Sequence, residues 1–173
     1  MVQNIAVVGL NREKAYEVAK DLAKELDMFF FDALELFEFD NIPRTFPEML
    51  KTYGVEYYRK KEKSIIGYSS EFTNCVINLE SGFCETESNF KVVKEGSLLV
   101  YLAEAPNIVC ENLLKQKFNS AQEEMFFLVD EEILKNRAEI LTKNADVIVN
   151  ASSGSSLKIV SETIRMIKNY YKK

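Results

Sequence analysis

The feature that most restricts the fold is a short apolar run closed by a glycine, residues 4–9, followed at once by an amphipathic stretch. An apolar run of this length is typical of a strand that is buried on both faces of a parallel sheet. In residues 13–26, apolar side chains recur on one helical stripe, which predicts a helix. The chain therefore begins with a strand, a turn and a helix.

The same alternation continues along the chain. Further strands are predicted at residues 28–32, 75–79, 97–102 and 145–150, helices at 47–67, 105–117, 123–141 and 157–171, and irregular or short helical structure at 33–39. Strands that alternate with helices favour a parallel sheet with both faces covered. We therefore predict an α/β protein with three layers, α/β/α, whose middle layer is a five-stranded parallel sheet. A chain of 173 residues can bury one substantial core, so residues 1–173 are expected to form a single domain.

Composition and charge exclude several classes of function. The formal net charge is −5, and lysines and arginines are scattered among acids, which argues against a nucleic-acid partner. The N-terminus has no basic leader, and no apolar stretch approaches the roughly 20 residues of a membrane helix. We expect a cytoplasmic protein with no membrane partner.

The cysteines and the lack of histidine further restrict the catalytic and metal-binding chemistry that is open to the chain. Cys75, Cys84 and Cys110 lack the CxxC spacing of a zinc or redox site, which fits a reducing compartment, and the chain contains no histidine. Histidine-dependent triads and histidine-ligated metals are therefore excluded. No metal site is expected.

Four segments, taken in order, carry a family resemblance. Residues 31–38 are similar to an FxDxDxxIE pattern, 54–62 to GExxFRxxE, 96–106 to GxVVYLxAxP and 137–146 to RxPLYxxxAD. These patterns, in this order and spacing, resemble the shikimate kinase family. The resemblance implies a P-loop kinase fold, with ATP-dependent phosphorylation of shikimate in aromatic amino acid biosynthesis as the family activity.

The phosphate-binding loop of that family is degenerate in this chain. The P-loop pattern is GxxxxGK followed by Ser or Thr, and only Gly9 survives here. Arg12 and Lys14 fall where the family has glycines, Ala15 falls at the lysine and Tyr16 at the Ser or Thr. Lys14 could replace the missing lysine by a one-residue slip, but that requires a rotation of about 100° around the helix.

Other family residues that support phosphoryl transfer are also lost. The second Asp of the DxD pattern becomes Leu34, which cannot accept a proton or bind a metal. The lid arginine has no counterpart in residues 118–128, and side chains enter the family's glycine triplet at Glu80 and Ser81. The resemblance therefore implies no catalytic residue in this chain.

The substrate-binding positions of the family are better preserved in this chain. Arg59 and Arg137 match the arginines with which the family holds the carboxylate of shikimate, and Glu62 could orient Arg59 from one helical turn away. Gly82 and Asp32 complete the candidate pocket. The alternative is that both arginines are ordinary surface residues.

Asp32 likewise has a structural alternative, as a strand-end carboxylate that caps backbone donors.

Two hypotheses of function follow. The first is a shikimate-kinase-like pseudoenzyme that uses no cofactor, retains a small-carboxylate pocket, and acts as a binding or regulatory module with a small ligand or a protein partner. The second is a divergent kinase of shikimate or a related small hydroxy acid, which would need ATP and magnesium and would recruit Lys14 and Asp32.

Overall fold

The computed structural model describes residues 4–40, 46–69, 71–115 and 130–172. Its sheet has five parallel strands in the order β2-β3-β1-β4-β5. The strands are β1 (Asn4–Gly9), β2 (Phe29–Asp32), β3 (Cys75–Leu79), β4 (Ser97–Ala103) and β5 (Val147–Asn150). The predicted α/β class and the five-stranded parallel sheet are confirmed.

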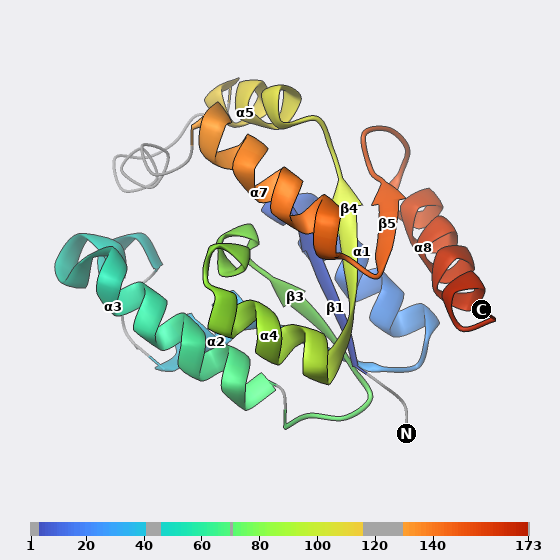
Figure 1. The fold of residues 1–173 in the computed structure, drawn as a ribbon, viewed down its shortest axis with the longest axis horizontal. Coiled ribbons are helices and arrows are strands. Elements are labelled where there is room, and N and C mark those ends of the chain that lie inside the picture. The colour runs from blue at the N-terminus through green and yellow to red at the C-terminus, as the bar shows by residue number, and fades with distance from the viewer. Residues whose placement is uncertain (1–3, 41–45, 70, 116–129, 173) are drawn as a thin grey trace.

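Helices enclose the sheet, and the α/β/α layering is also as predicted. They are α1 (Arg12–Glu25), α2 (Ala33–Asp40), α3 (Phe46–Ser69), α4 (Glu87–Gly96), α5 (Pro106–Lys115), α7 (Glu131–Asn144) and α8 (Ser156–Tyr170), with a 3₁₀ helix η1 (Ser81–Glu85). Helices α1 and α8 pack on one face of the sheet, and α3, α4 and α7 pack on the other (Figure 1). None of the helices in these ranges is long and apolar enough to cross a membrane.

Side-chain alternation along the buried strands divides the core in two. In β1, Ile5 and Val7 belong to the cluster under α1 and α8, whereas Ala6 and Val8 belong to the cluster under the opposite helices. All four side chains are at most 5% exposed, which explains why β1 is a continuous apolar run.

Two described elements differ from the sequence-based prediction. Helix α4 was not predicted, because the polar Asn89 lies on its buried stripe and interrupts the apolar period. The continuous helix predicted over residues 123–141 is wrong at Asp130, which is extended and caps α7 by accepting a hydrogen bond from the backbone NH of Ile133. Residues 116–129, including the segment searched for a lid arginine, lie outside the described residues.

The parallel strands all end at one edge of the sheet, where α/β proteins place their ligands. At this edge Asp32 closes β2, Gly9 closes β1, and η1 follows β3. Helix α3 brings Arg59 and Glu62 to the same region from the segment after a kink at Gly54, whose φ is 78°.

Candidate functional site

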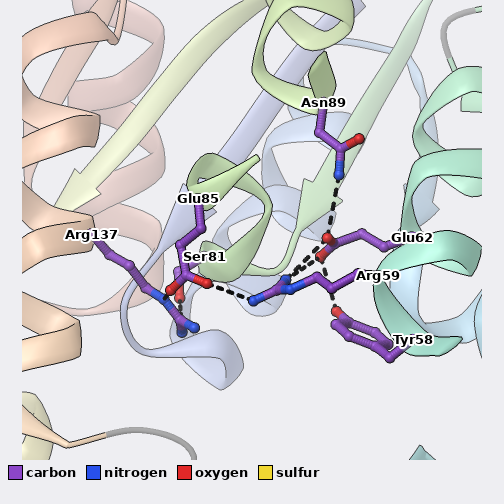
Figure 2. Close-up of polar contacts among 7 residues, drawn as sticks. All are labelled: Tyr58, Arg59, Glu62, Ser81, Glu85, Asn89 and Arg137. Carbon is purple, nitrogen blue, oxygen red and sulfur yellow. Dashed lines mark hydrogen bonds and ion pairs between the residues drawn. The ribbon is translucent and has the colours of Figure 1, made fainter. Parts of the chain in front are cut away.

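The two arginines predicted for the substrate pocket meet at one carboxylate, that of Glu85. Arg59 Nη2 donates to Glu85 Oε2 at 2.7 Å, and Arg137 Nε donates to Glu85 Oε1 at 2.6 Å. Figure 2 shows Glu85, at the end of η1, lying between the guanidinium groups that α3 and α7 supply. Each oxygen of this carboxylate is therefore held by a different arginine.

Glu62 holds Arg59 from the other side. Its carboxylate accepts hydrogen bonds from Arg59 Nη1 (3.0 Å to Oε2), from the Tyr58 hydroxyl (3.1 Å) and from Asn89 Nδ2 (3.3 Å). Glu62 is 6% exposed, and this burial raises its pKa although the charge of Arg59 opposes the shift. Burial also raises the pKa of Tyr58 well above its ordinary value. The orienting role predicted for Glu62 is consistent with this geometry.

Arg137 and Gly82 complete the cluster. Arg137 is 9% exposed, and its Nη1 donates to Ser81 Oγ at 3.2 Å. Gly82 lies against both guanidinium groups: a Cβ built on it would be 2.9 Å from Arg59 Nη1 and 3.1 Å from Arg137 Nη2. Neither arginine is an ordinary solvated surface residue.

A second cluster surrounds Asp32. The carboxylate of this 4% exposed residue accepts hydrogen bonds from Arg12 Nη2 (2.7 Å), from Asn78 Nδ2 (2.7 Å) and from the backbone NH of Glu35 (3.2 Å). Arg12 also pairs with Glu80 Oε1 through its Nε. Burial raises the pKa of Asp32, and Arg12 opposes the shift. The contact with Glu35 places Asp32 as a cap on the first turn of α2.

The segment aligned with the phosphate-binding loop has a different local structure. Helix α1 begins at Arg12, three residues after β1 ends at Gly9, and Asn11 caps it by accepting from the backbone NH of Lys14 at 3.1 Å. Lys14 Nζ forms an ion pair with Glu104 and donates to the carbonyl oxygen of Ala151 at 2.9 Å. The ammonium of Lys14 is thus committed to groups that follow β4 and β5.

Between the two clusters lies a small cavity of about 20 Å³. That volume holds about one water molecule. Its walls are mainly apolar and come from α2, α3, β3 and η1: Ala33, Leu34, Tyr58, Glu62, Ile65, Ile66, Leu79, Glu80 and Phe83. Across the ranges that the structure describes, no group of three or more acidic or cysteine side chains could hold a metal ion.

The structure therefore brings together Arg59, Arg137, Glu62 and Gly82, and joins Asp32 to Arg12 instead. Sequence reasoning missed Glu85 and Glu104, because each reaches its partner only through the tertiary fold. Glu85 is 26 positions from Arg59 and 52 from Arg137. The signal for Arg12 was present, since a cation stood where the resemblance implied a glycine, near a strand-end carboxylate.

Comparisons with known proteins agree with this architecture. The sequence model of the family described as shikimate kinase matches residues 17–168, a match that begins directly after the loop segment. A shikimate kinase of Clostridium botulinum (strain Kyoto / Type A2) is 26% identical over 171 residues, which cover 96% of this chain and 99% of that protein. One from Syntrophus aciditrophicus is 25% identical and covers 96% of this chain and 92% of that protein.

Solved structures show the same fold. Shikimate kinase from Acinetobacter baumannii, in complex with shikimate, superposes with a TM-score of 0.83 at 17% identity, covering 100% of this chain and 97% of that chain. Shikimate kinase from Aquifex aeolicus gives a TM-score of 0.79 at 21% identity, covering 95% and 96%. With the family match over most of the sequence, these relatives lead to one conclusion: the chain belongs to the shikimate kinase family.

Proposed function

We propose that this chain is a non-catalytic member of the shikimate kinase family that does not transfer phosphate from ATP. In this proposal the arginine pair, Arg59 and Arg137, is a binding site for a small carboxylate, and the protein acts as a binding or regulatory module.

One observation carries the proposal: the position aligned with the P-loop lysine is closed. Ala15 stands there, is 1% exposed, and belongs to the core cluster under α1 and α8. A Cβ built on Gly9 would be 3.2 Å from the Cβ of Ala15, so the helix packs tightly on the end of β1. A P-loop instead needs backbone that wraps the phosphates and a lysine that reaches them.

The cations that remain in this segment do not fit a nucleotide phosphate. Lys14 is paired with Glu104, and Arg12 lies between the carboxylates of Asp32 and Glu80. Glu13, exposed in the first turn of α1, adds negative charge where an anion would approach. We infer that ATP and magnesium are not cofactors of this chain.

The position of the second DxD aspartate supports the same inference. Leu34 stands there and lines the small apolar cavity, where it can neither take a proton from a substrate hydroxyl nor coordinate a metal. A kinase would have to use Asp32 in its place, but that carboxylate is occupied by Arg12 and Asn78.

The test is a coupled assay of shikimate-dependent ADP release, with a catalytically competent shikimate kinase of the family as positive control. We expect a rate equal to that of the no-enzyme control. A thermal-shift measurement with millimolar ATP and magnesium complements it, because a ligand that binds the folded state raises the melting temperature by mass action. Shikimate-dependent turnover would establish the divergent kinase instead.

A further inference from the structure

The carboxylate of Glu85 contacts the arginine pair in the way a bound carboxylate would. It bridges two guanidinium groups from different helices, one oxygen to each, at 2.7 and 2.6 Å. Charge-assisted hydrogen bonds of this length are among the stronger polar contacts in proteins. The chain therefore supplies from its own sequence the ligand group that this pair of arginines is suited to bind.

Charge balance agrees with this interpretation. In the cluster drawn in Figure 2, two arginines face two carboxylates, Glu62 and Glu85, so the formal charges cancel. Without Glu85 the cluster has one excess positive charge. One carboxylate group from a ligand would restore the balance.

Glu62 and Glu85 differ in how firmly they are held. The Glu62 side chain is 7% exposed and also accepts from Tyr58 and Asn89, whereas the Glu85 side chain is 30% exposed. Among the described residues, the polar contacts of the Glu85 side chain are those with the two arginines. Glu85 can therefore turn toward solvent without breaking any other described contact, while Glu62 cannot.

We propose that Glu85 is a specificity-determining residue: its carboxylate competes with ligands for Arg59 and Arg137, so a carboxylate ligand binds by displacing it. This inference rests on the proposed carboxylate site. A tethered group competes at a high effective concentration, so a bare carboxylate such as acetate binds poorly. Ligands that succeed are small monocarboxylates whose remaining atoms make further contacts with the site.

The experiment measures the dissociation constant of shikimate by calorimetry for the wild type, Glu85→Ala and Glu85→Gln. Glu87→Ala is the matched control, because it removes an exposed carboxylate two positions away in the first turn of α4. We expect Glu85→Ala to bind shikimate at least about tenfold more tightly than the wild type, about 1.4 kcal/mol. Glu87→Ala should bind as the wild type does.

Two further binding measurements identify the cause of any gain in shikimate affinity. The methyl ester of shikimate, which lacks the charge, should show no gain in Glu85→Ala, and adding Arg59→Ala to that variant should abolish the gain. Glu85→Gln keeps the size of the side chain and gives a second folded variant if removing Glu85 destabilises the protein.

The outcomes separate the two proposals. If the Glu85 variants bind shikimate no better than the wild type, or do not bind it, the competition by Glu85 is refuted while the absence of ADP release still stands. An equal gain for the methyl ester also refutes it. Shikimate-dependent ADP release by the wild type would refute the proposed non-catalytic function without bearing on Glu85.

Discussion

A Cβ built on Gly82 would lie 2.9 Å from Nη1 and 3.0 Å from Nη2 of Arg59, and real Cβ atoms essentially never come within 3.0 Å of a neighbouring atom. Gly82 therefore leaves the space that the guanidinium group occupies. The φ angle of Gly82 is not positive, so the requirement for glycine at this position is steric and does not come from the backbone conformation.

Gly82→Ala should displace Arg59 from its partners. The end of an arginine side chain can move, but here it is hydrogen bonded to Glu62 and Glu85, and moving it disrupts those bonds. We expect the free energy of unfolding to fall by about 1–2 kcal/mol, and any shikimate affinity to fall with it. Urea unfolding and calorimetry measure the two effects.

Gly67→Ala is the matched control, because a Cβ on this helical glycine of α3 meets nothing within 4 Å. It should raise stability by up to about 1 kcal/mol through helix propensity. Equal effects of the two substitutions would show that the contact between Gly82 and Arg59 has no energetic importance.

The ion pair of Lys14 with Glu104 predicts coupling between α1 and the end of β4. Their side chains are 29% and 8% exposed, so Lys14→Met leaves a mostly buried carboxylate without its cation. We expect a loss of about 1–3 kcal/mol in the free energy of unfolding. In a double-mutant cycle with Glu104→Gln, the coupling energy should be about 1–2 kcal/mol.

The control for this cycle is Lys24→Met, an exposed position in the last turn of the same helix. Its effect should stay within about 0.5 kcal/mol. Strict additivity of the Lys14 and Glu104 substitutions would mean that Lys14 is available to another partner, as the kinase alternative requires.

The raised pKa of Glu62 should make the free energy of unfolding depend on pH. Burial raises its pKa above the ordinary 4.5, so between these two values the folded chain binds more protons than the unfolded chain. The free energy of unfolding contributed by Glu62 is therefore highest below the unfolded pKa and falls as pH rises through the folded pKa. Glu62→Gln lacks this dependence, so its stability relative to the wild type should improve as pH rises from 4 to 7.

Tyr58→Phe should have the opposite effect on this slope. The Tyr58 hydroxyl donates to Glu62 and lowers the pKa of that carboxyl, so removing it enlarges the upward shift. The decline in stability between pH 4 and 7 should then be steeper than in the wild type. Parallel pH profiles for all three proteins, measured by urea unfolding, would contradict the assignment to Glu62.

The fold could be predicted from sequence because apolar residues form continuous runs in the buried strands but recur at helical spacing in the amphipathic helices. The apolar runs that form β1 and β4 carry polar residues only at their ends, and the run that forms β3 is interrupted only by Asn78; all three strand assignments agree with the structure. Helix α4 could not be predicted in this way, since Asn89 is buried at 1% exposure on its inner stripe. Its amide is there to donate to Glu62, a reason that appears only in three dimensions.

The candidate site could be predicted only in part, because only some of its residues lie in segments that resemble the family. Arg59, Glu62 and Arg137 were identified through segments that resemble the family, and the structure places them together. Glu85 has no local signal, because its significance depends on two residues from other helices. The pairing of Arg12 with Asp32 and of Lys14 with Glu104 was missed in the same way, although cations stood where the resemblance implied glycines.

Restoring the family lysine should not restore nucleotide binding. Ala15 is 1% exposed and packs in the core under α1, so Ala15→Lys places an ammonium group among apolar side chains with no partner. We expect a loss of more than about 3 kcal/mol in the free energy of unfolding, and no thermal shift with ATP and magnesium. Glu13→Lys, at an exposed position of the same helix turn, introduces the same side chain and should be tolerated. If Ala15→Lys instead remains as stable as the wild type and gains an ATP-dependent shift, the segment after β1 can open into a phosphate-binding loop. The loss of the lysine would then be the whole reason for the absence of nucleotide binding, and the early start of α1 at Arg12 would have no part in it.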